Sequence, residues 1–198
     1  MDNDPYNFIM QVDWNEAPKG FTIFNGFVHR TFNEMDLWHL MNFLKYHYCF
    51  CGEESLETAF TQWMQPGDVN IENALTGFHN YVFSYDEEAS QEKHCRKHIA
   101  SPQKKSACKR LNMFLRWMVR SDRTGVDFGI WKNISPAQLI IPIDVHVSRV
   151  AKRLNILQRT QNDWQAALEL TKYLQQLNAA DPIKYDYALF GLGVIEKY

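Results

Sequence analysis

The stretch Leu139-Ile140-Ile141-Pro142-Ile143-Asp144-Val145-His146-Val147 places one carboxylate between an apolar run and the start of an expected helix. Beyond it, Val147, Val150 and Leu154 recur at the spacing of one helix face. Asp144 stands directly before this helix, where a side-chain oxygen can accept hydrogen bonds from the first free backbone N–H groups. We therefore expect Asp144 to be a helix cap, a catalytic acid, or both.

Similar amphipathic spacing recurs along the chain, whereas alternating apolar and polar residues form only short runs, which favours an all-α fold. The 198 residues, 45% of them hydrophobic, are enough for one substantial core. We expect one two-lobed helical domain over 1–198, with an acidic part at about 1–92 and a basic, Asp144-bearing part at about 93–198. The expected helices cover about 34–49, 54–64, 71–85, 87–98, 105–121, 145–155, 162–177 and 183–193, with a short extended or hairpin segment near 20–32.

Two of these helices carry start signals, and one segment between helices is irregular. Asp181-Pro182 puts an acceptor at the N-cap and proline at the first helical position. Asn162 or Asp163 can cap the helix that begins near Trp164. The least regular internal segment is 121–135, which separates the basic helix from Asp144.

Charge is distributed unevenly although the net charge is only -2. Residues 1–92 hold 15 acids and 3 bases, whereas residues 93–123 hold 10 bases and 1 acid. A local basic block concentrates positive potential on one surface, which suits capture of a phosphate backbone. The same block could instead be a solvated helix face that pairs with the acidic N-terminal part.

The helix expected over 105–121 brings three of these cations onto one side. Lys109, Arg116 and Arg120 are 7 and 4 residues apart, so they lie within roughly 40° of arc around the helix axis. Leu111 and Leu115 fall mostly on the other side, which predicts a buried apolar face and an exposed cationic stripe. The alternative is that the two arginines form ion pairs with acids of a neighbouring helix.

Residues 142–154, P-I-D-V-H-V-S-R-V-A-K-R-L, resemble the segment that carries the catalytic aspartate in helix-hairpin-helix (HhH-GPD) DNA glycosylases of base-excision repair. Their P-x-D-x-H core is most similar to the 8-oxoguanine glycosylase branch. That superfamily has a lysine at the start of its second hairpin helix. The closest match here is Lys109 in K-S-A-C-K-R-L, with Lys105 as the reserve.

Most of the chain also resembles a bacterial protein family of unassigned function, itself similar to a remote member of that superfamily. The matching pieces are 26–32 (G-F-V-H-R-T-F), 109–120 (K-R-L-N-M-F-L-R-W-M-V-R), 139–147, and 181–190 (D-P-I-K-Y-D-Y-A-L-F). Relatives begin further upstream, so the resemblance implies a chain truncated at its N-terminus that lacks a wall of the pocket.

The resemblance implies a DNA glycosylase/AP lyase that removes a damaged base, with oxidised purine as the leading class. Asp144 would stabilise positive charge on the sugar, and Lys109 as a neutral amine would attack C1′, form a Schiff base and cleave the strand by β-elimination. The flipped base would stack on Phe114, Trp117, Phe128 or Trp131, each of which also fits a core position. The phosphates of the duplex would be held by Lys104, Lys105, Arg110, Arg116, Arg120, His146 and Arg149.

Three features depart from the glycosylase pattern. Residues 101–106 contain no glycine, so the glycine-rich hairpin that grips phosphate is missing. The 35-residue spacing from Lys109 to Asp144 is closer to a variant archaeal arrangement than to the common enzymes. No cysteine follows Cys108, so there is no iron-sulfur loop. A non-catalytic helical DNA-binding module, or a protein-interaction domain with a basic helix, therefore remains open.

Other patterns favour a cytoplasmic monomer without a cofactor or metal. No run of about 18 apolar residues occurs, and the first residues lack the basic and apolar regions of a signal peptide. The four cysteines are expected to be reduced, and their spacing matches no zinc site. His94 and His98 stand at i and i+4, but no third ligand accompanies them.

Overall fold

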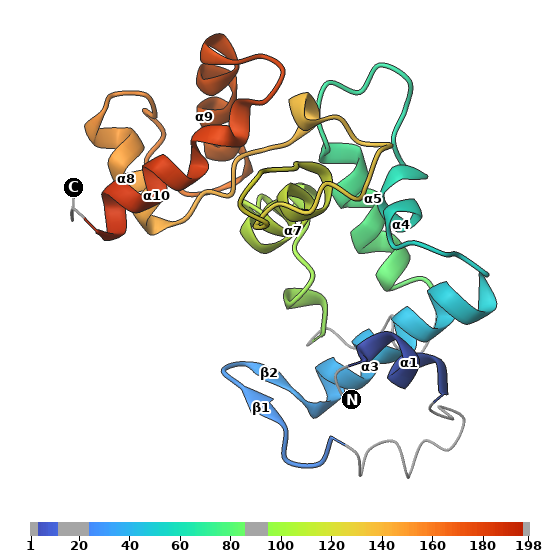
Figure 1. Cartoon of the computed structure of the whole chain (residues 1–198). Helices are drawn as coiled ribbons and strands as arrows, with labels where there is room; N and C mark the ends of the chain where they lie inside the picture. Colours follow the sequence, from blue (N-terminus) through green and yellow to red (C-terminus); the bar gives the residue numbers. More distant parts are fainter. Residues whose placement is uncertain (1–3, 12–23, 86–94, 196–198) are drawn as a thin grey trace. The chain divides into compact units, whose positions relative to one another are not determined.

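The computed structural model describes residues 4–11, 24–85 and 95–195, and its predominantly helical character confirms the expected class (Figure 1). The chain forms two compact units. Unit 1 comprises residues 1–62 and 77–99, and unit 2 comprises residues 63–76 and 100–198. The division crosses helix α5 (Glu72–Val82), whose first residues belong to unit 2 and whose remainder belongs to unit 1. Within the described residues, no helix is long and apolar enough to cross a membrane.

Unit 1 is built from short helices around one longer helix, α3. It contains α1 (Pro5–Gln11), strands β1 (Val28–His29) and β2 (Phe32–Asn33), α3 (Glu34–Lys45), the π-helical turn η1 (Tyr46–Phe50), α4 (Glu57–Thr61) and the 3₁₀ turn η2 (Cys95–Lys97). Asn33 and Asp36 form a reciprocal capping box that fixes the start of α3. The helix expected over 34–49 is therefore confirmed, with its last turn widened.

The hairpin of unit 1 falls at the end of the extended or hairpin segment expected near 20–32. Val28 pairs with Asn33, and His29 with Phe32, in antiparallel register. Residues 20–23 of the expected segment lie outside the described residues. The helix expected over 87–98 also lies mostly outside them. The core of unit 1 packs Ile9, Phe24 and Met41 together, with Phe60 stacked on Phe78 at 3.9 Å between ring centroids.

Unit 2 contains residues 139–147, the apolar segment that leads into Asp144 and the following helix. Its elements after α5 are η3 (Pro102–Lys104), α7 (Lys109–Val119), η4 (Pro136–Gln138), α8 (Val145–Arg153), α9 (Trp164–Leu177), η5 (Pro182–Tyr185) and α10 (Asp186–Val194). α7 begins four residues later than expected, because Lys105 and Cys108 adopt left-handed backbone angles that no α-helix contains. The helices α8 and α9 lie where the spacing predicted them.

Buried apolar residues from all parts of unit 2 form its core. Asp163 caps α9 by accepting a hydrogen bond from the Ala166 backbone N–H, as its position predicted. Asp181 occupies the N-cap position of η5, but its side chain makes no capping bond. The fully buried side chains of unit 2 include Leu115, Ile134, Leu139, Ile141, Leu157, Trp164, Leu170 and Ile183.

Candidate active site

Asp144 caps helix α8. Its Oδ1 accepts hydrogen bonds from the backbone N–H groups of His146 and Val147, both at 2.9 Å. Its backbone angles are extended, as an N-cap residue requires, because the buried run before it enters the helix as an extended strand-like segment. The capping bonds fix the rotamer of Asp144 through one oxygen and leave Oδ2 available to another group.

The group that takes Oδ2 is Lys109. Its Nζ lies 3.0 Å from Asp144 Oδ2, across 35 residues of sequence. Lys109 is the first residue of α7, and Cys108 before it, at φ 50°, turns the chain into the helix. The Lys109 side chain is 42% exposed, whereas that of Asp144 is 10% exposed. The pair therefore joins an accessible amine to a largely buried carboxylate at the first turns of two helices.

The surroundings keep Asp144 ionised. Burial alone would raise its pKa, but the hydrogen bonds from the Val147 backbone and from Lys109, with the charge of Lys109, hold the pKa below the ordinary value. A carboxylate in this state is a fixed negative charge at neutral pH. It can stabilise a neighbouring cation, and it is a poor proton acceptor.

The expected cationic stripe on α7 is wrong for two of its three members. Arg116 is 2% exposed, and its guanidinium contacts Asp186 at 2.5 Å and Asp127 at 3.3 Å. Arg120 is also largely buried and binds both oxygens of Asp181 at 2.8 Å. Of the three residues, Lys109 alone keeps a substantially exposed side chain. Arg116 and Arg120 therefore cannot serve as phosphate ligands.

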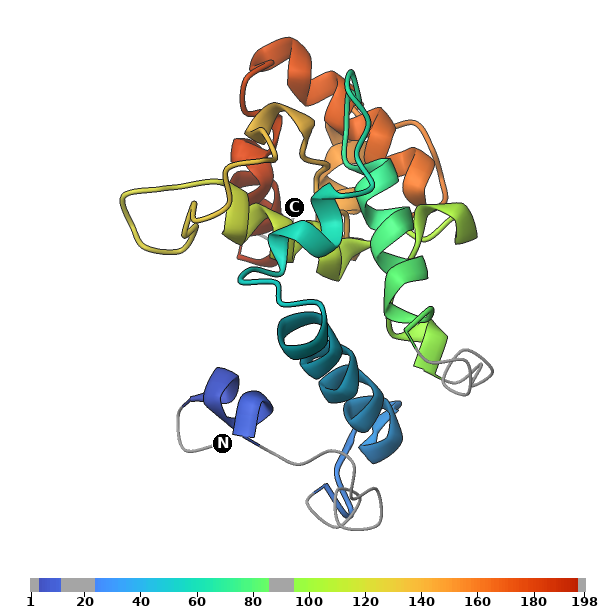
Figure 2. The ribbon, with the colours of Figure 1, turned by 90° about the vertical axis from the view of Figure 1, so that its right-hand side faces the viewer.

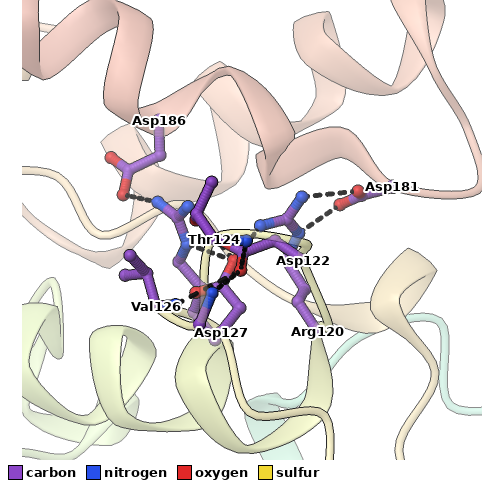
Figure 3. Close-up of polar contacts among 9 residues, drawn as sticks. Arg120, Asp122, Thr124, Val126, Asp127, Asp181 and Asp186 are labelled. Carbon is purple, nitrogen blue, oxygen red and sulfur yellow. Dashed lines mark hydrogen bonds and ion pairs between the residues drawn. The ribbon is translucent and has the colours of Figure 1, made fainter.

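Figure 3 shows the resulting cluster, in which arginines from α7 meet carboxylates from three segments. Asp127 is fully buried, and its Oδ2 accepts from both Arg116 and Arg120. Asp181 precedes η5, and Asp186 begins α10. Because arginine carries a planar fork of donors, it suits such partly buried pairs. The arginines therefore tie α7 to the loop that follows it and to α10.

The loop after α7, the yellow loop at the left of Figure 2, is held in place by hydrogen bonds within the loop and to the end of α7. The Asp122 carboxylate accepts bonds from the backbone N–H groups of Thr124, Gly125 and Val126. The N–H groups of Phe128 and Gly129 donate to the carbonyl of Trp117 at the end of α7. At Gly129, with φ +60°, an added Cβ would lie 2.5 Å from the Ser121 side chain, so the close approach of the two loop ends requires glycine.

His146 and Arg149, two further expected DNA ligands, connect α8 to α10. The ring of His146 meets that of Phe190 edge-on at 6.0 Å, and its Nδ1 is buried without a hydrogen-bond partner among the described residues. Arg149 Nη2 donates to the carbonyl of Gly193 at 2.5 Å. A Cβ at Gly193 would come within 2.9 Å of the His146 Cβ. The two helices thus pack closely beside Asp144.

The remaining expected DNA ligands are exposed around the start of α7. Lys104, Lys105 and Arg110 are all exposed. Lys105 adopts φ 58°, and its carbonyl accepts a long hydrogen bond of 3.4 Å from the Trp164 backbone N–H. Together with the partly exposed Lys109, these side chains form a group of cations at the surface over residues 104–110.

The four aromatic residues expected to hold the base, Phe114, Trp117, Phe128 and Trp131, belong to α7 and the segment that follows it. Trp131 is buried against Phe114, with 5.4 Å between ring centroids, and the backbone N–H of Trp131 donates to the carbonyl of Met118. Phe128 is exposed on the loop at the C-terminal end of α7, beside Trp117. Trp117 and Met118, whose carbonyls accept these backbone bonds, lie eight and nine residues after Lys109, about 12 to 14 Å along the helix at 1.5 Å per residue. The bonds therefore hold Phe128 and Trp131 toward the C-terminal end of α7.

Nearly the whole chain matches one known protein family. A family model described as a protein of unknown function (DUF2400) matches residues 1–195. The chain belongs to the DUF2400 family. Neither the curated proteins nor the solved structures include a match to it.

Three residues of this DUF2400 chain that sequence reasoning passed over lie near the pair. Asp186 binds Arg116, and burial together with the charge of Asp144 raises the pKa of Asp186. Tyr187 covers the guanidinium of Arg116 at 3.7 Å, and Phe190 contacts His146. Tyr187 and Phe190 are both partly exposed and stand three residues apart on α10. Two aromatic residues at helical spacing, directly after Asp186 in the first turn of α10, were the sequence pattern that could have indicated these residues.

Over residues 4–11, 24–85 and 95–195, no three side chains of His, Cys, Asp or Glu gather as metal ligands would.

Proposed function

We propose that this protein is a DNA glycosylase/AP lyase of the helix-hairpin-helix type, acting on a damaged base through Lys109 and Asp144. The observation that carries the proposal is the distance of 3.0 Å between Lys109 Nζ and Asp144 Oδ2. It places a potential amine nucleophile beside an ionised carboxylate, and the P-x-D-x-H segment supplies that carboxylate.

The chemistry assigns a different role to each member of the pair. As the bond between C1′ and the base breaks, positive charge develops on the sugar, and a fixed carboxylate stabilises it. Asp144 suits this role because its capping bonds hold it in position before substrate arrives. Lys109, once it has left Asp144 and released a proton to solvent, would attack C1′ and form a Schiff base.

The surroundings support a nucleic-acid substrate. Lys104, Lys105 and Arg110 are exposed near the first turn of α7, where the helix dipole also favours anions. If these three side chains neutralise three phosphates, log K should fall against log[salt] with a slope of about -3. The damaged base and its opposite base are not specified by these contacts.

The test is trapping with borohydride on duplexes that contain an abasic site or 8-oxoguanine. The Schiff base should be reduced to a stable adduct by the wild type and not by Lys109→Gln. Lys105→Gln, which removes an exposed lysine four residues away, is the matched control: it should still trap at saturating DNA, although it loses one of the proposed phosphate contacts. Asp144→Asn should bind the duplex normally and release base far more slowly.

Other results would assign other functions. Adducts that persist in Lys109→Gln and disappear in Lys105→Gln would move the nucleophile to Lys105. Binding to duplex DNA without any adduct or base release would favour a non-catalytic DNA-binding module. Failure to bind DNA at low salt would leave a protein-interaction domain as the better account of the basic segment.

A further inference from the structure

The buried cluster beside the pair contains more carboxylates than cations. Arg116 and Arg120 face Asp127, Asp181 and Asp186 (Figure 3). With all five groups ionised, the cluster would hold one uncompensated negative charge in a largely buried place. Burying an unpaired charge is expensive, so a group there tends to bind a proton instead. The composition of the cluster therefore favours one protonated carboxyl.

The contacts indicate which carboxyl carries that proton. Asp181 is held by two parallel bonds from Arg120, and Asp127 accepts from both arginines. Within the described part of the chain, Asp186 is bound by Arg116 alone, through Oδ2, and Figure 3 shows its other oxygen on the side away from that bond. Asp127 Oδ1 is also without a hydrogen-bond partner among the described residues, but two arginines share Asp127 Oδ2. Asp186, with one bond from one arginine, is therefore the least compensated of the three.

Asp186 and Asp144 occupy electrostatically opposite environments within one site. Burial raises the pKa of Asp186, and the charges of Asp144 and Asp127 raise it further against the opposing effect of Arg116. The pKa of Asp144 is lowered. Neighbouring carboxyl groups whose pKa values are driven apart commonly divide acid and electrostatic roles between them.

We propose that Asp186 is the general acid of the site, donating a proton from its free oxygen to the departing base. This role rests on the proposed function. As the C1′–N bond breaks, its electron pair passes to the base, which takes the Asp186 proton. Lys109, whose ammonium proton has passed to solvent water, bonds through its nitrogen to C1′, and Asp186 is left as a carboxylate against Arg116. Asp144 remains ionised throughout.

The other charged groups around α10 leave this assignment intact. On α8, His146 and Arg149 contact Phe190 and Gly193, at least one helical turn beyond Asp186. On η5, Lys184 lies over the ring of Tyr185 at 5.2 Å. The charges that face Asp186 are accordingly those of Arg116, Asp127 and Asp144.

The protonation can be measured on the free, full-length protein without any substrate. Carbon-13 NMR of labelled aspartate carboxyls should show one signal that titrates above the ordinary carboxyl range and is lost in Asp186→Asn. Asp163 provides an internal reference, because its bond from Arg159 lowers its pKa to about 2. Titration of Asp186 at or below the ordinary value would overturn the proposal.

The catalytic role is tested by separating base release from chemistry at an abasic site. Asp186→Asn should slow release of the damaged base by about 10²-fold, because general acids contribute on that scale. It should trap normally on a pre-formed abasic site, where no base departs. Asp186→Glu, which restores a proton donor, should recover part of base release.

A loss of stability alone would slow both reactions together, so equal decreases would refute the acid role. Normal base release by Asp186→Asn would refute it as well, while leaving the proposed function in place. A wild type that neither traps nor releases base would refute the proposed function, and the acid role with it. Circular dichroism of each variant verifies that the compared proteins are folded.

Discussion

Replacing Arg116 by methionine would remove the cation that links α7 to Asp127 and Asp186. Breaking a buried ion pair by deleting one partner typically costs about 3–5 kcal/mol, since the remaining charge stays buried. Loss of the contact with the Tyr187 ring adds about 0.5–1 kcal/mol. We expect a total of about 4 kcal/mol, which is a large fraction of the stability of a typical domain.

Urea unfolding followed by tryptophan fluorescence measures this loss. At a slope of about 2 kcal/mol per molar, the midpoint should fall by about 2 M. Arg110→Met is the matched control, because Arg110 is an exposed arginine on the same helix. Its effect on stability should stay within about 0.5 kcal/mol. Asp127→Asn added to Arg116→Met should restore part of the stability, since it removes one buried carboxylate that has lost a cation.

DNA binding should be weakened by Arg110→Met and not by Arg116→Met, which is the reverse of their effects on stability. Arg110→Met should reduce the salt slope of binding by about one, as loss of a phosphate contact does. Arg116→Met should leave that slope unchanged as long as the protein is folded. If Arg116→Met proved as stable as the wild type and lowered the salt slope instead, our account of Arg116 as a structural ion-pair partner would be refuted.

Three further predictions concern α8 and α10. Asp144→Ala should lose about 1–2 kcal/mol of stability and Asp144→Asn only a few tenths, because asparagine still caps; equal losses in urea unfolding would argue against capping. Gly193→Ala should cost about 1–3 kcal/mol, because its Cβ would meet His146. Gly191→Ala, with open space around its Cβ, should instead gain up to about 1 kcal/mol; thermal melts that rank the two variants otherwise would contradict this packing. The lowered pKa of Asp144 means that its contribution is complete above the ordinary carboxyl pKa of about 3.9 and is lost as pH falls through the lower folded-state value. The stability gap between wild type and Asp144→Ala should therefore narrow at pH 3, and a gap equal to that at pH 7 would disprove the linkage.

The parts of the fold that depend on neighbouring residues were predictable from the sequence. The apolar spacing after Asp144 and the acceptor at Asp163 located the starts of α8 and α9, because capping involves residues only two or three apart. The start of α7 was less predictable. Left-handed backbone at Lys105 and Cys108 is unusual for residues other than glycine, so composition carries no signal for it.

The parts that depend on distant residues were not predictable in this way. Periodicity showed that Arg116 and Arg120 share one side of α7, but it cannot show what covers that side. The acids that cover it include Asp181 and Asp186, which lie 61 and 70 residues from their arginines along the chain. Asp181 was expected to cap η5, and its carboxylate binds Arg120 instead.

The candidate pair also depended on more than spacing. Lys109 and Asp144 were selected together through a resemblance, since nothing in 35 intervening residues fixes their distance. The contact between them arises because α7 and α8 both begin at the same place in unit 2. The aromatic side chains beside them come from α10, which enters the site from the far end of the sequence.

The contact between Lys109 and Asp144 has a consequence for the free protein. Cells contain sugars, aldehydes and other small carbonyl compounds that react with neutral lysine side chains, and an accessible reactive amine would be consumed by them. An ammonium group held 3.0 Å from a carboxylate has no lone pair to offer. Lys109 must therefore leave Asp144 and lose its proton before it can react with such a compound.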